Sequence, residues 1–337
     1  MYPVLFKIPF IDLPIYSYGV MLGLSLVVGW YVVMYLGSKN GLPADKLANC
    51  YIWTAVSALL GSRILYIITN LSEYQDAGII DLLNVRKGGL VAYGGFLGGF
   101  FGSWVYLKKQ RIRLLPWADV VVPSLGSGLG ITRIGCFLYG CDFGKPIPAD
   151  APGWIQAIGL RFPNWSIRFP ELAEQFRQGT GCMSGQFQGS PAFYHHVRNL
   201  SLAKMDDVAS ALVYPTQLLE VANGWIAFVL TLLVHKKARF RGQAFLFFTA
   251  YYGVTRALFE IIRGDTQRGG IGIFSTSQII GVTTFTAAAI AYYFLARQAK
   301  ADPIAAMDLG PGAVVENTAA DDSNKPPEPR VKRRKKK

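Results

Sequence analysis

The stretch GLGITRIGCFLYGCDFGKP, residues 128–146, is an apolar, glycine-rich run with one arginine, Arg133, inside it. Similar apolar runs of about 20 residues recur along the chain, and each is long enough to cross a bilayer as a helix. The 337-residue chain is 51% hydrophobic and only 16% charged, which is typical of a protein with many membrane spans. Arg133 is therefore predicted to lie within a membrane span, where a charged side chain is costly and indicates a structural or functional role.

We predict an all-α integral membrane protein with seven transmembrane helices. Their windows are 16–36, 51–71, 89–107, 117–138, 211–234, 243–262 and 274–296. Lys and Arg are concentrated after the first, third, fifth and seventh windows, so the positive-inside rule puts the N-terminus outside and the C-terminus in the cytoplasm. The first window has no small-residue cleavage site after it and is interpreted as an uncleaved span.

Two segments lie outside these windows. Residues 139–210 are too many for a plain connector, so we expect a small extracytoplasmic loop subdomain with a helical run, PELAEQFRQ, at 170–178. Together with the spans it would complete a membrane catalytic domain of residues 1–298. Residues 299–337 are rich in Pro, Asp, Asn and Lys and predict a disordered, basic cytoplasmic tail that contacts anionic lipid headgroups.

The net charge of +13 does not indicate nucleic-acid binding, because much of it lies in the tail and in short loops beside apolar runs. The cysteines form no CxxC pair, and only Cys136 and Cys141 are close enough in the sequence to meet. The histidines, His195, His196 and His235, lie in predicted loops. GxSxG, HExxH and GxxxxGK[ST] are absent. We therefore predict no metal site and no cofactor.

Among the charged residues within the windows we single out Arg63, Asp119, Arg133, Arg256 and Glu260. Insertion of such a charge costs roughly 2.5–3.5 kcal/mol, so each is a functional hypothesis. The alternative is an internal ion pair that fixes helix packing. For Arg63 and Asp119 the sequence leaves both interpretations open.

The sixth window carries Tyr252, Arg256 and Glu260, and Arg263 follows it directly; the spacing puts all four on one helix face. One interpretation is an Arg256–Glu260 salt bridge beside an interfacial tyrosine and a snorkelling Arg263. The other interpretation places Arg133 together with Arg256, and Arg263 at the rim, in one cationic pocket. Guanidinium groups suit phosphate, and the phosphate at that depth belongs to a phospholipid headgroup.

Two tyrosines complete the candidate site. Tyr93 lies between glycine pairs in KGGLVAYGGFLGGF, residues 87–100, and is either an interfacial belt residue or an exposed phenol that contacts substrate. Tyr18, in IYSYGVM, has the same two interpretations.

Five segments in this order resemble one family: GGLVAYGG, the TRIG-containing span that ends in FGKP, YPTQLLEVANG, YGVTRALFEIIRGD and GIFSTSQIIG. Together they resemble the phosphatidylglycerol:prolipoprotein diacylglyceryl transferases of bacterial inner membranes, from about residue 16 to 294. The resemblance implies transfer of a diacylglyceryl group from phosphatidylglycerol to the lipobox cysteine of a prolipoprotein signal peptide, with release of glycerol phosphate. It also implies a multi-pass inner-membrane monomer.

The resemblance assigns site residues position by position. Arg133 and Arg256 match the family's arginines and are expected to be catalytic together with Tyr93. The residues expected to bind substrate are Tyr18, Asp119, Asp142, Gln217, Tyr252, Glu260 and Arg263.

The chain departs from the family pattern after Arg133. The family commonly has Gly-Asn-Phe-x-Asn-x-Glu, whereas this chain has Gly-Cys-Phe-Leu-Tyr-Gly-Cys at 135–141. Asp142 is expected to supply the missing carboxylate, and Cys136 and Cys141 could pair on an oxidising side. Tyr93 stands where a histidine is common, and a phenol with a pKa near 10 is a poor base.

Two other functions stay open on the sequence. A non-catalytic relative that binds phospholipid or signal peptides would explain the departures equally well. A membrane transporter would also use buried charges, but inverted repeats with broken helices would be expected, and the sequence has none.

Overall fold

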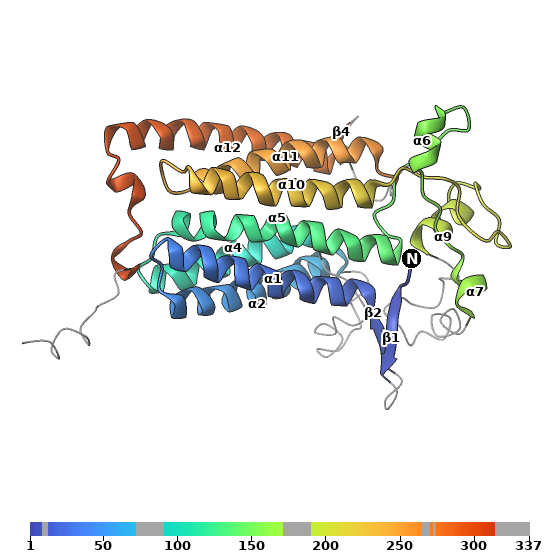
Figure 1. The fold of residues 1–337 in the computed structure, drawn as a ribbon, viewed down its shortest axis with the longest axis horizontal. Coiled ribbons are helices and arrows are strands. Elements are labelled where there is room, and N and C mark those ends of the chain that lie inside the picture. The colour runs from blue at the N-terminus through green and yellow to red at the C-terminus, as the bar shows by residue number, and fades with distance from the viewer. Residues whose placement is uncertain (9–12, 72–90, 171–189, 265–269, 272–273, 314–337) are drawn as a thin grey trace, which may run out of the picture.

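In the computed structural model of the protein, the described residues are 1–8, 13–71, 91–170, 190–264, 270–271 and 274–313. Long helices dominate this part of the chain and run along the long axis of the molecule (Figure 1). They are α1 (Ser17–Lys39), α2 (Ala44–Thr69), α4 (Ala92–Lys109), α5 (Leu114–Tyr139), α10 (Thr216–Lys236), α11 (Gln243–Ile262) and α12 (Thr276–Ala301).

Six of the helices in the described residues are long and apolar enough to cross a membrane, namely α1, α2, α5, α10, α11 and α12. The chain is therefore a multi-pass membrane protein. Helix α4 occupies the third predicted window, 89–107, but it is not among the six. It has only 18 residues, is rich in glycine and ends in two lysines.

Some helices extend beyond one end of their predicted windows, because an apolar window leaves out polar turns at a helix end, whereas α11 coincides with its window of 243–262. Helix α2, for example, begins at Ala44 and not at residue 51, because its first two turns carry Asp45, Lys46 and Asn49. Such polar turns suit the membrane boundary.

The two ends of the bundle differ. At one end, here called the loop end, lie the antiparallel hairpin β1–β2 (Val4–Ile8 and Leu13–Tyr16) and the pair β3–β4 (Gly270–Ile271 and Phe274–Ser275). The loop end also carries three short helices, α6 (Gly153–Ile158), α7 (Trp165–Arg168) and α9 (Pro191–Arg198). The helical run predicted at 170–178 lies, after Pro170, outside the described residues. At the other end, the short-turn end, brief connections join α1 to α2, α4 to α5 and α10 to α11.

Helix α5 lies at the centre of the bundle. Of its most apolar window 56% is buried, against 6–22% for the other five candidate spans. It packs against α1 on one side and α10 on the other. A Cβ atom on Gly224 of α10 would lie 2.7 Å from the Cα of Gly130 of α5, so the two backbones touch. Small residues at such a crossing let helices approach closely, and here the crossing sets Arg133 opposite Glu220.

The loop between α5 and α10 packs around its own apolar cluster at the loop end. Phe143, Phe162, Ala192 and Val213 are buried there together. Backbone bridges join Leu160 to Val213 and residues 163 to 209. The predicted loop region thus has an ordered core next to the end of α5.

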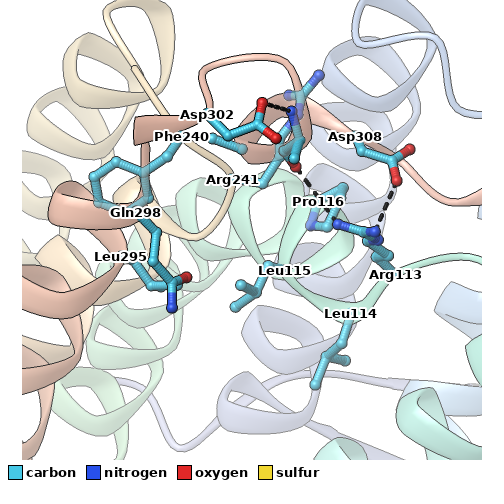
Figure 2. A pocket seen from close by; sticks show the side chains of 12 residues that line it. Arg113, Leu114, Leu115, Pro116, Phe240, Arg241, Leu295, Gln298, Asp302 and Asp308 are labelled. Carbon is cyan, nitrogen blue, oxygen red and sulfur yellow. Dashed lines mark hydrogen bonds and ion pairs between the residues drawn. The ribbon is translucent and has the colours of Figure 1, made fainter. Parts of the chain in front are cut away.

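The C-terminal segment crosses the short-turn end. Residues 302–313, here called the C-terminal strap, contain the turns η3 (Ala305–Met307) and η4 (Pro311–Ala313). The N–H groups of Arg113 and Arg241 donate to carbonyl oxygens of the strap at 3.0 and 2.9 Å. The strap covers a cavity of about 290 Å³. Figure 2 shows side chains that line it, with the ion pair between Arg113 and Asp308 (2.8 Å) among them.

The ordered strap shows that the predicted start of the disordered tail, residue 299, is wrong. We predicted disorder from residue 299, whereas α12 continues to Ala301 and the strap is packed through Ala313, which is buried. Composition alone suggested a free tail, but it does not reveal hydrogen bonds to distant turns. Residues 314–337, the remainder of the predicted tail, lie outside the described residues.

Asp119 is not part of the candidate site. It is buried in α5 near the short-turn end, roughly 21 Å along the helix from Arg133 at 1.5 Å per residue. Its carboxylate accepts hydrogen bonds from the backbone N–H groups of Gly242 (2.6 Å) and Phe245 (2.9 Å). These groups begin α11 and have no partner inside that helix, so Asp119 caps α11 from a neighbouring helix.

We therefore expect Asp119→Ala to lower the free energy of unfolding by about 1–2 kcal/mol, because buried N–H groups lose their acceptor. Thermal unfolding in detergent measures the change. Asp150→Ala, at an exposed loop position, is the control and should stay within about 0.5 kcal/mol of wild type. An unchanged midpoint for Asp119→Ala would rule out the capping role.

His196 in α9 is buried, and neither ring nitrogen has a hydrogen-bond partner among the described residues. Burial, aided by the neighbouring His195, lowers the pKa of His196 from 6.5 to about 4. The unfolded chain then binds the proton more tightly than the folded chain, so stability is present above pH 6.5 and is lost as the pH falls towards 4.

His196→Phe keeps an aromatic ring against Phe143 and should flatten the pH dependence of the melting temperature in this window. Melting curves of both proteins at about pH 7 and about pH 4.5 test this. Equal slopes in wild type and variant would contradict it.

Candidate active site

Four charged side chains meet where α5, α10 and α11 reach the loop end. Arg133 forms ion pairs with Asp142 and, through Nε, with Glu220 (2.7 Å). Arg263 forms ion pairs with the other oxygen of Asp142 and with Glu220 (3.3 Å). The charges therefore alternate around a closed set, here called the four-charge ring.

The backbone after α5 creates the ring. Residues 143–145 pair with 262–264 through hydrogen bonds from Lys145 N to Ile262 O and from Gly264 N to Phe143 O, each 2.9 Å. A Cβ on Gly144 would meet the backbone oxygen of Tyr214, so only glycine allows this approach. The pairing brings the start of the loop to the end of α11, which sets Asp142 beside Arg263.

Asp142 has an unusual backbone conformation, with φ = 56°, in the left-handed region where Asp is one of the better tolerated residues. Two residues of α10 hold this turn in place. Thr216 donates to the carbonyl oxygen of Asp142 (2.9 Å), and Gln217 donates from Nε2 to that of Cys141 (2.8 Å). Gln217 is fully buried, and its Oε1 has no hydrogen-bond partner among the described residues.

The ring is charge-balanced and mostly buried. Two guanidinium groups face two carboxylates, and the side chains are 2–20% exposed. Charges taken out of water are stable only when they are paired and hydrogen-bonded. Removal of any single member would therefore leave an uncompensated charge next to the others.

A second polar group lies beside the ring. Arg256 pairs with Glu260 (2.7 Å) and donates to Ser277 of α12 (2.9 Å). Its Nη1 is buried without a hydrogen-bond partner in the described part of the chain. A cavity of about 20 Å³, enough for a water molecule, is lined by Arg256 together with Arg133, Glu220, Asn223, Tyr252 and three further side chains of α5 and α11. A donor without an acceptor thus belongs to a side chain that lines this cavity.

The predicted tyrosines surround this region. Tyr252 lines the cavity, stacks on Phe248 with ring centroids 6.0 Å apart, and is within electrostatic range of Arg133, Arg256 and Tyr93. Tyr93 is 40% exposed on α4. Tyr18 is 41% exposed at the start of α1, where a Cβ on Gly135 would lie 3.1 Å from its Cα.

Two thiols adjoin the ring. Cys136 donates from Sγ to Asp142 at 3.3 Å and accepts from Arg133 Nη1 at 3.8 Å. Cys136 and Cys141 are both free, so the pairing considered from the sequence is not formed. One ligand atom each from Cys136, Cys141 and Asp142 lies within 4.8 Å of the others, so these three residues could hold a metal ion.

With this geometry established, comparison with known proteins identifies the family. The family model for prolipoprotein diacylglyceryl transferase matches residues 3–294. The chain belongs to the prolipoprotein diacylglyceryl transferase family. A phosphatidylglycerol–prolipoprotein diacylglyceryl transferase of Clostridium tetani is 29% identical over 284 residues, which cover 84% of this chain and 94% of that protein. The corresponding transferase 2 of Clostridium perfringens is 30% identical over 273 residues, 80% of this chain and 87% of the relative.

Within this diacylglyceryl transferase fold, most of the predicted site residues gather at the loop end. Arg133, Asp142 and Arg263 are in the ring, Gln217 supports it, and the others except Asp119 surround it. Sequence reasoning missed Glu220 and Asn223. Glu220 is a carboxylate within the window 211–234. The criterion that identified Arg133, a charged residue inside an apolar window, would therefore have identified Glu220 as well. Asn223 follows three residues later on the same helix face.

A double-mutant cycle tests whether the transferase depends on the balanced charge of its ring. Glu220→Gln or Arg263→Gln alone should destabilise the protein by about 3–5 kcal/mol, because one buried charge is left unpaired. The double variant restores the balance and should recover part of the loss, with a coupling of about 0.5–3 kcal/mol in unfolding measurements. Strictly additive losses would show that the two side chains do not interact.

Proposed function

We propose that this chain transfers a diacylglyceryl group from phosphatidylglycerol to the cysteine thiol of a prolipoprotein and releases glycerol phosphate. The family match and the names of its relatives support this reaction. The observation that carries it is that Arg133 and Arg256 line one cavity, because the reaction needs cations at a phosphate. The cavity has room for about one water molecule here, so these side chains have to move apart to admit a phosphate.

Both arginines have donors left over. Arg133 uses Nη1 and Nε for its ion pairs with Asp142 and Glu220, and these two pairs do not involve its Nη2. Nη1 of Arg256 has no hydrogen-bond partner within the described ranges. A phosphate between them would accept charge-assisted hydrogen bonds from the remaining N–H groups of both guanidinium groups. Tyr252 lines the same cavity and would add a hydroxyl donor.

The reaction breaks the C–O bond between the diacylglyceryl group and phosphate, and forms a C–S bond to the thiolate of the acceptor. The leaving phosphate gains negative charge as that C–O bond breaks. Fixed guanidinium groups in a site shielded from water stabilise such charge strongly, because no solvent has to reorganise. The ring holds Arg133 in position through Asp142 and Glu220, and Ser277 and Glu260 hold Arg256.

Asp142 supports an active enzyme over a non-catalytic relative. The family carboxylate absent at position 141 is replaced by the next residue, whose left-handed backbone turns its carboxylate towards Arg133 and Arg263. Tyr93 and Tyr18 are proposed to contact the headgroup, and Gln217, Glu260 and Arg263 to shape the site.

We further propose the topology that suits this reaction. Helix α4 would cross the membrane in addition to the six helices named above, which makes seven spans. The loop end would face outwards in a bacterial inner membrane. The prolipoprotein would approach with its lipobox cysteine from that side, and residues 139–210 would receive its signal peptide. The positions of Lys and Arg at the short-turn end support this orientation. The protein would act as a monomer, with its tail on anionic lipid.

We expect Arg133→Gln and Arg256→Gln each to lower kcat/KM by about 10²–10³-fold, because each removes a donor from the leaving phosphate. The assay uses purified full chain, labelled phosphatidylglycerol and a lipobox peptide, with a Cys-to-Ser peptide as blank. Arg256→Gln leaves the four-charge ring intact, so it remains informative if Arg133→Gln is unstable.

The matched control is Arg113→Gln, which removes a guanidinium from the short-turn end, where it pairs with Asp308. It should retain transfer. Near wild-type transfer by folded Arg256→Gln would refute the phosphate role. No transfer by wild-type protein that still binds phosphatidylglycerol would point to the non-catalytic relative.

A further inference from the structure

The proposed reaction needs a thiolate, yet each carboxylate in the described part of the site, Asp142, Glu220 and Glu260, is held in an ion pair with an arginine. The sequence has three histidines. His195 and His196 lie in α9 and pack against Phe143, and His235 is at the end of α10, 2.8 Å from Asn40 at the short-turn end. Tyr93, as a phenol, is ill suited to remove a proton near neutral pH. Some other feature has to activate the acceptor thiol.

We propose that Cys136, Cys141 and Asp142 bind a zinc ion whose open fourth position takes the cysteine of the acceptor. This inference rests on the proposed function and deepens it. Three protein ligands with one open position are typical of catalytic zinc, and a thiol that binds zinc is deprotonated at neutral pH. We call the three residues the thiol–carboxylate cluster.

The distances suit zinc. With Zn–S of about 2.3 Å and Zn–O of about 2.0 Å, tetrahedral ligands lie about 3.5 Å apart for a sulfur–oxygen pair and about 3.8 Å for two sulfurs. The Sγ of Cys136 is 3.3 Å from Oδ2 of Asp142, and all three ligand atoms are within 4.8 Å of one another. An ion between them needs only small side-chain adjustments.

The charges also suit a divalent ion. The two guanidinium groups of the ring are balanced by the carboxylates of Asp142 and Glu220. Two thiolates would add two negative charges, which one divalent cation neutralises. Thiolate ligands select zinc over magnesium or calcium, which prefer oxygen. Oδ2 of Asp142 has a second lone pair, so it can face both Arg133 and the ion.

An independent observation marks the same place as incomplete. Gln217 is fully buried and donates to the carbonyl of Cys141, but its Oε1 has no partner among the described residues. A buried acceptor without a donor in a native structure usually awaits a water, an ion-bound water or a substrate group. An N–H of the incoming peptide next to its cysteine would satisfy it.

The acceptor thiol binds zinc and releases its proton to solvent. Its sulfur then forms the C–S bond while the C–O bond to phosphate breaks, and glycerol phosphate leaves with the bonding electrons. Arg133 adjoins both the cluster and the cavity, so nucleophile and leaving group lie on either side of one side chain.

Metal content and cobalt spectroscopy test the site without any reliance on activity. Full-length protein in detergent, exposed to Zn²⁺ and then desalted, should retain about one equivalent, with affinity lowered about 10-fold or more in Cys136→Ser and Cys141→Ser. Cys50→Ser, a buried thiol in α2 far from the cluster in sequence, is the control and should bind as wild type. With Co²⁺ as the probe, a lipobox peptide should strengthen the thiolate-to-cobalt absorption, and the Ser peptide should not.

Activity separates this inference from the proposed function. Chelator-treated wild type and Cys50→Ser should lose transfer and regain it with Zn²⁺. Three results would refute the zinc site without refuting the transferase function. They are full transfer by metal-free enzyme, a Cys136–Cys141 disulfide in active enzyme, and a cobalt spectrum that does not change when the Cys peptide is added. If the cobalt spectrum responds to the Cys peptide but Zn²⁺ never supports transfer, the zinc site stands and the proposed function fails.

Discussion

The four-charge ring is the constraint on which the loop end depends. Each charge of Arg133, Asp142, Glu220 and Arg263 is largely buried, so each requires its neighbours. The ring therefore fixes the ends of α5, α10 and α11 relative to one another. The glycine crossing of α5 with α10 and the backbone pairing of residues 143–145 with 262–264 bring the four groups within reach.

This arrangement gives one arginine several roles. Arg133 stabilises the fold through two carboxylates, lines the cavity proposed for phosphate, and touches the thiol of Cys136. The guanidinium of Arg133, inside an apolar span, is thus neutralised by two carboxylates of the protein and still has N–H groups outside these ion pairs. Such a side chain is pre-organised, because its position does not depend on the substrate.

Much of this could be predicted from the sequence, and the limits are physical. Apolar windows located the long helices, and charges within windows identified Arg133 and Arg256, because both features are local in the sequence. The role of Asp142 depends on a positive φ and on pairing with a segment about 120 residues away, which no local pattern contains. Asp119 met the same criterion as Arg133, yet it caps a helix, because a buried carboxylate serves either purpose.

The C-terminal strap has a practical meaning for anyone who handles this protein. It lies beyond residue 294, where the match to the family ends, and it anchors α12 to the turns at Arg113 and Arg241. A shortened chain designed from family boundaries would stop before the strap and leave the cavity of Figure 2 without one of its walls. Expression tags and fusion partners are therefore better joined after Ala313, so that the last helix keeps both of its attachments.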